Sequence, residues 1–224
     1  MTLEMVTDII IFIASLVSFI YGFFKILIQK KKALYLKMIV LAIAGIMISR
    51  ANIMLQYLTR GAENQDFHVG LLGLVGCFLF LLSANYGEMD RLVDDGSKEF
   101  FKYRMLSWIA PVILLVIFSL VFLGGASFSR SRTIMCSVVM LVLAVASRFH
   151  LKHYIFPDAE YGVVRRIRGY NAVALVLCLA ATVLLMADVT GNSYMYFGAG
   201  IVMAIGCLIL LPLLQREVAK WTTI

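Results

Sequence analysis

Residues 67–104 of the chain read FHVGLLGLVGCFLFLLSANYGEMDRLVDDGSKEFFKYR. The first half of this stretch is an apolar run, and it passes without a break into a segment dense in charges of both signs. About 20 apolar residues are enough for a helix to cross the hydrocarbon core of a lipid bilayer. The stretch therefore predicts a membrane-spanning helix that ends in a charged loop.

The composition of the whole chain is that of a membrane protein. Of its 224 residues, 62% are hydrophobic and 15% are charged, and the mean hydropathy is +0.94. A soluble domain carries roughly 25% charged residues, so the charge content is too low for that class. The net charge of +7 does not indicate nucleic-acid binding, because the basic residues lie in short loops between apolar runs, where they set orientation and contact anionic lipid. The expected partner is the lipid bilayer, and no nucleic acid is expected.

Seven apolar runs are long enough to cross a bilayer, and they are continuous rather than alternating. We therefore predict an all-α fold, a polytopic bundle of seven transmembrane helices that forms a single domain over residues 1–224. The spans lie near residues 7–28, 34–57, 67–87, 104–125, 133–153, 170–189 and 194–214.

The basic residues give the bundle an orientation. Sixteen of the 20 lysines and arginines lie in or beside the loops after the first, third and fifth spans or near the C-terminus, and 4 lie on the other side. Short cytoplasmic loops are enriched in lysine and arginine. We therefore predict an N-terminus outside the cell and a cytoplasmic C-terminus, in a multi-pass protein of the cell membrane, namely a bacterial cytoplasmic membrane.

The charged loop after the third span is expected to contain a short interfacial helix near residues 97–104. Ser97 can cap its N-terminus, and Pro111 can kink the span that follows. With the basic segment Arg165–Arg168, which we place in the loop before the sixth span, this loop forms a cytoplasmic face for a cytoplasmic or membrane protein partner. The docking residues that we predict are Asp90, Asp94, Asp95, Lys98, Arg165 and Arg166.

Small residues recur at four-residue spacing in three spans. Gly45 and Ser49 lie in the second span, Gly73 and Cys77 lie in the third, and Gly200 and Ala204 lie in the seventh. Helices in lipid associate where small residues let their backbones approach closely. These positions therefore predict packing faces, with the four cysteines of the chain as free thiols inside apolar runs.

Arg50 is a charged residue inside the outer half of the second span, where a charge normally faces the bundle interior. Two interpretations follow from it. In the first, Arg50 anchors an anionic or carboxylate ligand in an outward polar pocket. In the second, it forms a structural ion pair with Asp8 or Asp188, or reaches the outer headgroups. The ligand-binding residues of the first interpretation are Arg50, Asn52, Gln56, Tyr57 and Asp188.

A second polar set lies toward the cytoplasmic side. His150 and His153 share a helix face and could hold a metal only with Asp158 or Glu160, so we interpret them as interfacial histidines and predict no metal site. Asp90 and Asp94 are spaced four residues apart. We expect these two carboxylates to pair with Arg91, Lys98 or Lys102, or to cap the interfacial helix.

The same aspartates do not form a catalytic motif. A diphosphate-binding DDxxD motif would need an aspartate where Lys98 stands, and the chain has no glycine-rich phosphate loop and no HExxH motif. We therefore predict no enzyme activity and no cofactor. The seven-span plan with an outer pocket and an inner docking face favours a sensor- or receptor-like protein. The alternatives are a small-solute transporter and an accessory or scaffold subunit of a membrane complex.

Overall fold

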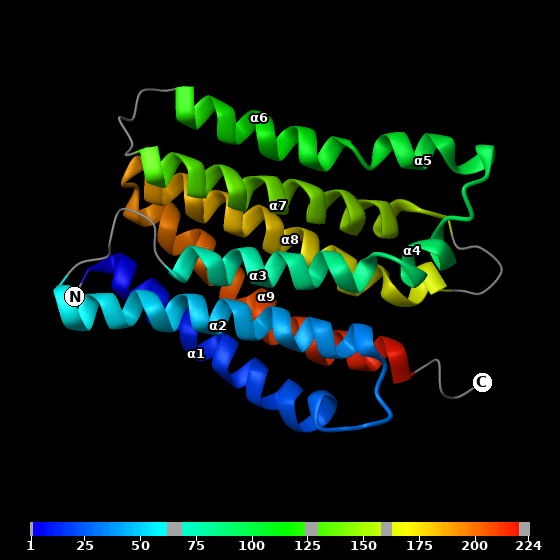
Figure 1. Cartoon of the computed structure of the whole chain (residues 1–224), viewed down its shortest axis with the longest axis horizontal. Coiled ribbons are helices and arrows are strands. Elements are labelled where there is room, and N and C mark those ends of the chain that lie inside the picture. The colour runs from blue at the N-terminus through cyan, green and yellow to red at the C-terminus, as the bar shows by residue number, and fades with distance from the viewer. Residues whose placement is uncertain (1, 62–68, 124–129, 158–162, 220–224) are drawn as a thin grey trace.

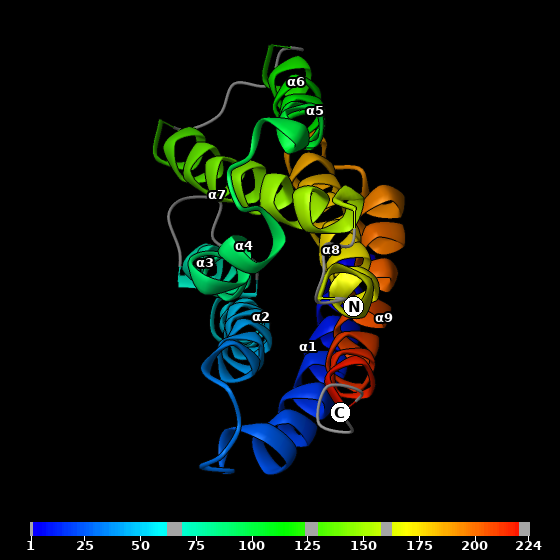
Figure 2. The ribbon, with the colours of Figure 1, turned by 90° about the vertical axis from the view of Figure 1, so that its right-hand side faces the viewer.

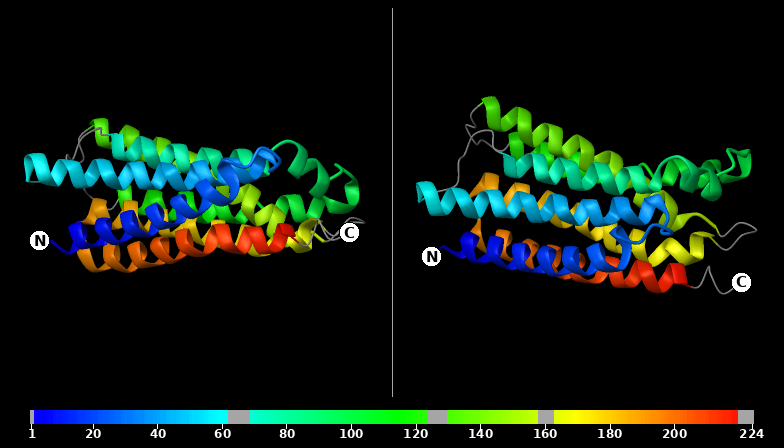
Figure 3. Two further views of the ribbon diagram at one scale, coloured as in Figure 1. Left: turned by 90° about the horizontal axis from the view of Figure 1, so that it is seen from below. Right: turned by 60° about the horizontal axis from the view of Figure 1, so that its bottom comes forward.

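The computed structural model describes residues 2–61, 69–123, 130–157 and 163–219, and every regular element in these ranges is a helix. The long helices are α1 (Leu3–Gly22), α2 (Leu34–Arg60), α3 (Val69–Asn85), α6 (Ile109–Leu123), α7 (Arg130–Ile155), α8 (Val163–Thr190) and α9 (Ser193–Ala219). They run along one common direction (Figure 1, Figure 3). We call the end of the bundle that contains the start of α1 its N-terminal end. The opposite end, which contains the end of α9, is its C-terminal end. The all-α prediction is confirmed for the described residues.

The helices are long and apolar in the way that membrane spans require. Six segments in the described ranges could cross a bilayer, and they are Leu3–Leu27, Leu34–Arg60, Lys98–Leu120, Ile134–Ile155, Val164–Thr190 and Ser193–Glu217. The first of them is α1 extended by a π-helical turn, Phe23–Leu27. α3 is also apolar but has only 17 residues. The apolar helices indicate a multi-pass integral membrane protein.

Six of the long helices form a closed ring. Neighbours around it are α1, α2, α3, α7, α8 and α9, and α9 packs back on α1. α6 lies outside the ring against α7 and α8, so it forms the edge of the molecule (Figure 2). The core fills the inside of the ring, and its largest fully buried side chains include Ile43, Phe78, Leu143 and Leu177.

α2 and α3 touch through their small residues. A Cβ atom built on Gly73 would lie 2.7 Å from the carbonyl oxygen of Gly45 and 2.8 Å from the Cβ of Ser49. A Cβ atom on Gly45 would lie 2.9 Å from the amide nitrogen of Cys77. These separations are too short for any side chain, so the backbones are in direct contact. The packing face predicted from the spacing of these four residues is confirmed.

α8 begins at Val163, well before the predicted start of the span at residue 170. Arg165, Arg166 and Arg168 therefore lie on the first turns of a helix, and the prediction that they belong to a loop is wrong. The first turns of a helix can extend beyond its apolar region. Arginines there do not prevent this, because arginine is a good helix former.

The segment between α3 and α6 is more helical than the sequence suggested. It contains α4 (Glu88–Val93), which was not predicted, and a 3₁₀ turn, Lys98–Phe100, that continues into α5 (Phe101–Leu106) at the predicted interfacial helix. Ser97 stands at its N-cap position but makes no side-chain cap hydrogen bond. The helix breaks between α5 and α6, just before Pro111, because proline has no N–H to donate to the preceding turn.

The contact between α2 and α3 can be tested with two glycines of α3. Gly73→Ala should lower the free energy of unfolding in detergent micelles by about 1–3 kcal/mol, because its methyl group would overlap the α2 backbone. Gly76→Ala is the matched control, because a Cβ atom there meets nothing within 4 Å. It should leave stability unchanged or raise it slightly through helix propensity. Equal effects of the two substitutions would contradict the close contact.

Candidate functional site

A buried ion pair joins three helices near the N-terminal end. Arg50 of α2 donates from Nη1 to Asp8 Oδ1 of α1 at 2.7 Å and to the hydroxyl of Tyr196 of α9 at 2.8 Å. The Tyr196 hydroxyl donates to the same Asp8 oxygen at 2.9 Å. The exposed fractions of Asp8 and Arg50 are 0% and 3%. Of the two interpretations of Arg50, the structure therefore contains the ion pair with Asp8.

This pairing is what allows charged groups to lie inside the bundle. A carboxylate or guanidinium is expensive to bury unless an opposite charge and hydrogen bonds compensate it. Asp8 Oδ1 receives two such bonds, whereas Asp8 Oδ2 is buried without a hydrogen-bond partner among the described residues. The cluster is thus held together on one oxygen of Asp8 and leaves the other oxygen unsatisfied.

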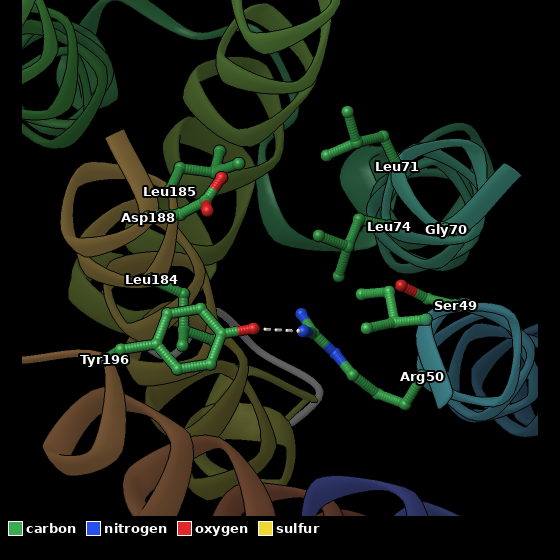
Figure 4. Close-up of a pocket in the computed structure, with 10 residues that line it drawn as sticks. Ser49, Arg50, Gly70, Leu71, Leu74, Leu184, Leu185, Asp188 and Tyr196 are labelled. Atoms are coloured by element: carbon green, nitrogen blue, oxygen red, sulfur yellow. Dashed lines mark hydrogen bonds between the residues drawn. The ribbon is translucent and has the colours of Figure 1, made fainter. Parts of the chain in front are cut away.

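A small cavity lies beside Arg50, between α2, α3, α8 and α9. Asp188 of α8 and Arg50 approach it from opposite sides, and Tyr196 lies below Asp188 (Figure 4). Ser49 also lines it, and the buried Ser49 hydroxyl has no hydrogen-bond partner in the described part of the chain. Its volume of about 20 Å³ matches a single water molecule. The cavity as it stands can admit nothing larger than water.

The structure divides the predicted ligand-binding residues into two groups. Arg50 and Asp188 line the cavity. Asn52 and Gln56 instead hydrogen-bond to each other at 2.8 Å, and Asn52 Oδ1 accepts from the Gly70 amide at 3.2 Å, which fastens α2 to α3. Tyr57 is half-buried on α2 and is not among the cavity-lining residues.

Asp8 and Tyr196 belong to the cluster. The sequence places both at a depth similar to that of Arg50, where they could line the outward pocket, but they are not among the predicted ligand-binding residues. Asp8 had been recognised as a partner for Arg50, because it is an isolated carboxylate in an apolar span. Tyr196 follows the turn after α8, and only the packing of α9 on α1 brings its hydroxyl to Asp8. The sequence held no local signal for that contact.

A second buried cluster joins α3, α7 and α8 in the other half of the bundle. The amide nitrogen of Asn85 lies 2.8 Å from His150 Nδ1 and donates to Asn171 Oδ1 at 2.6 Å. The Asn171 amide donates to the carbonyl of Ile167 at 3.0 Å. All three clustered side chains are at most 1% exposed. The His150 imidazole therefore lies between helices rather than on the surface of the bundle, and its predicted depth at the membrane interface stays a prediction.

A third cluster fixes α4 to the end of α7. Lys152 Nζ pairs with Asp90 Oδ1 and with Asp94 Oδ2, both at 2.8 Å, and His153 Nε2 lies 2.9 Å from Asp90 Oδ1. Arg104 of α5 pairs with Asp94 at 3.0 Å. The two carboxylates thus bind cations of α7 and α5 instead of the expected Arg91, Lys98 and Lys102. His153 is also fully buried, and its predicted depth at the membrane interface likewise stays a prediction.

The electrostatics of the loop carboxylates follow from these contacts. Burial alone would raise the pKa of Asp90, but hydrogen bonds from His153 and Lys152 and the Lys152 charge outweigh burial and lower it. The exposed Asp95 accepts the Ser97 amide at 2.8 Å, and this bond lowers the pKa of Asp95. Both groups are therefore carboxylates at neutral pH.

The predicted docking residues differ in how far they remain accessible. Asp95, Lys98 and Arg165 are exposed at the C-terminal end of the bundle, and Arg166 is half-buried there. Asp90 and Asp94 are occupied by the ion pairs with α7. Within the described ranges, no group of three His, Cys, Asp or Glu side chains is placed to hold a metal ion, and Asp158 and Glu160 lie outside those ranges.

Comparisons of the chain with protein-family models, with curated proteins and with solved structures found no match. The three polar clusters between helices and the exposed charges at the C-terminal end are the features of the molecule that bear on its function.

The ion pair can be tested by a double-mutant cycle. Arg50→Ala should lower the free energy of unfolding by about 3–5 kcal/mol, because it leaves the Asp8 carboxylate buried without a partner. Asp8→Asn combined with the same Arg50→Ala should recover part of that loss, because the double variant buries no unpaired charge. Arg60→Ala, at an exposed position on the same helix, is the control and should change stability by less than about 0.5 kcal/mol. Additive effects of the two cluster substitutions would contradict direct coupling.

The Asp90 cluster should make stability depend on pH. A carboxylate with a lowered folded pKa stabilises the fold above its unfolded pKa of about 4, and this contribution is lost as the pH falls through the folded pKa. Asp90→Asn should therefore be about 1.5–3 kcal/mol less stable than the wild type at pH 7, and the difference should shrink below about pH 4. Unfolding in micelles between pH 3 and 8 measures it, with the exposed Glu99→Gln as control. If the stability difference between Asp90→Asn and the wild type stays constant with pH, the charge of Asp90 is not its cause.

Proposed function

We propose that this protein is a sensor- or receptor-like protein of the cell membrane, with seven spans, the N-terminus outside and the C-terminus in the cytoplasm. The placement in a bacterial cytoplasmic membrane belongs to the same proposal. The bias of 16 basic residues to 4 supports the orientation. α3 would be the seventh span, because 17 helical residues extend about 26 Å, close to the roughly 30 Å of the hydrocarbon core.

The sensing element in this proposal is the cluster of Asp8, Arg50 and Tyr196 with Asp188 beside it. Arg50 is already paired, and the cavity next to it is of water size, so the structure would correspond to the closed, ligand-free state. A small anionic or carboxylate ligand would compete with Asp8 for the guanidinium. That competition would loosen α1 and α9 from α2, which is a change of helix packing that a partner can detect.

The observation that carries the proposal is the course of α8. This helix runs for 28 residues, roughly 42 Å, and contributes a residue to each level of the bundle. Asp188 lines the outer cavity, Asn171 belongs to the buried cluster with His150, and Arg165 is exposed at the C-terminal end. A continuous helix moves as a rigid rod, so a displacement at Asp188 would reach Arg165.

The output of such a sensor would be read by a protein partner in the cytoplasm or the membrane. The exposed charges Asp95, Lys98 and Arg165 would form its docking face, and the ion pairs of Lys152 would hold the α4 segment in place beside them. We propose no enzymatic activity, because the sequence has no glycine-rich phosphate loop and no HExxH motif.

The experiment places spin labels at Lys98→Cys and Arg165→Cys in nanodiscs and measures the distance between them. The four native cysteines are at most 1% exposed, so labelling should be confined to the new sites. Tyr196→Phe and Asp188→Asn alter the outer cluster and should change the distance distribution at the far end by a shift or a second population. Thr190→Val is the control, because this exposed residue lies on the last turn of α8 and its hydroxyl bonds to its own helix.

An unchanged distance distribution in both cluster variants would overturn the sensor proposal. If it is unchanged, solute uptake into proteoliposomes becomes the next measurement, since transport needs no such readout. Orientation is tested with two single-cysteine variants: a membrane-impermeant maleimide should label Arg60→Cys in intact cells and Lys98→Cys only after the cells are opened. The reverse pattern would overturn the predicted topology.

A further inference from the structure

Arg148 lies on α7, inside a candidate membrane span. No acidic side chain in the described part of the chain pairs with it. Its guanidinium lies 4.0 Å from the ring centre of Trp108 and 5.6 Å from that of Phe149. Its Nε–H group is buried and donates no hydrogen bond to any of the described residues. Arg50 and Arg104, by contrast, both pair with aspartates.

The chemistry of the guanidinium implies a missing anion. Arginine always carries its charge and presents five N–H donors in one plane. The contact with Trp108 is a cation–π interaction, which uses the face of the plane and leaves its N–H edges available. A charged group near the apolar region of a membrane is stabilised when its donors reach phosphate groups at the membrane surface.

The position of Arg148 places it within reach of such phosphates. It lies seven residues before the end of α7 at Ile155, which corresponds to roughly 10 Å along the helix axis. Trp108, at the break between α5 and α6, is 47% exposed, and tryptophan is enriched at the level of lipid headgroups. The break before Pro111 is what turns this indole toward α7.

Apolar side chains next to the site are exposed in the way that lipid contact requires. On α7, the residues one and two turns before Arg148 on its own face are Val145 and Leu141, which are 39% and 61% exposed. On α6, Val112 and Val116 are 54% and 52% exposed. Acyl chains can lie along these two helices while a headgroup reaches Arg148. Inorganic phosphate has no apolar part that could contact this surface.

We propose that Arg148, held between Trp108 and Phe149, binds the phosphate of an anionic phospholipid at the C-terminal end of the bundle. Two phosphate oxygens would accept the N–H groups of the guanidinium edge, which is the pairing that arginine favours. The exposed Lys102 of α5 adds positive charge at the same end and favours a headgroup of net negative charge over a zwitterionic one. This site lies apart from the Asp8 cluster, so it does not depend on the proposed sensor function.

The test uses Trp108 itself as the probe. The chain has two tryptophans, so Trp221→Phe leaves Trp108 as the only one. In nanodiscs, quenching of Trp108 by phosphatidylglycerol with brominated acyl chains is compared with quenching by brominated phosphatidylcholine. One favourable charge contact predicts a preference of about fivefold for the anionic lipid. Arg148→Gln should bring this ratio close to one, and Arg148→Lys, which retains the charge without the planar fork, should give an intermediate value.

Two controls separate this site from general charge effects. Arg165→Gln removes an exposed arginine from the same end and should leave the preference unchanged. Inorganic phosphate, added at an ionic strength matched with chloride, should not displace the lipid; if it does, the site takes free phosphate and the lipid proposal fails. Equal quenching by the two lipids in the Trp221→Phe protein would overturn the proposal, even if Arg148→Gln does not fold.

Discussion

The contact between Asp8 and Arg50 is the interaction on which the N-terminal half of the bundle depends. A guanidinium at 3% exposure can stay inside an apolar structure only because a carboxylate and a tyrosine hydroxyl meet it. These three side chains come from α1, α2 and α9. Moving α1 from α2 would separate the two charges, and moving α9 would remove the hydroxyl that hydrogen-bonds to both of them. The ring therefore closes in one register, which apolar packing alone does not specify.

The neighbouring pair of helices in the ring, α2 and α3, is held together by contact between their backbones instead of by an ion pair. Gly45, Gly73 and Ser49 let α2 and α3 approach until their main chains touch, which is the usual way to join helices where lipid removes the hydrophobic driving force. This contact positions α3, and α3 in turn carries Asn85 to His150 and Asn171. The position of the buried polar cluster in the C-terminal half therefore depends on the glycine contact between α2 and α3.

The sequence predicts the features that depend on local pattern and misses those that depend on tertiary contact. Continuous apolar runs predict the helices, and the spacing of Gly73 and Cys77 predicts a face of α3, because both signals lie within one element. The start of α8 was misplaced because the arginine cluster suggested a loop, although arginine continues a helix readily. The sequence does not predict the burial of His150 and His153, which comes from partners on α3, α8 and α4. Those partners are far apart in sequence, and no local pattern links them.

The layer between the two polar levels bears on the choice between sensing and transport. Inside the ring it is filled by Ile43, Phe78, Leu143, Leu177 and Met203, each at most 1% exposed. A solute moving from the Arg50 cavity to His150 would have to part five helices across this layer, at the expense of their packing. A signal needs only a small displacement of intact helices, because α8 joins the two levels through the same layer. Tight packing between separated polar clusters is therefore an obstacle to transport but an aid to mechanical coupling, and it favours the sensor-like proposal.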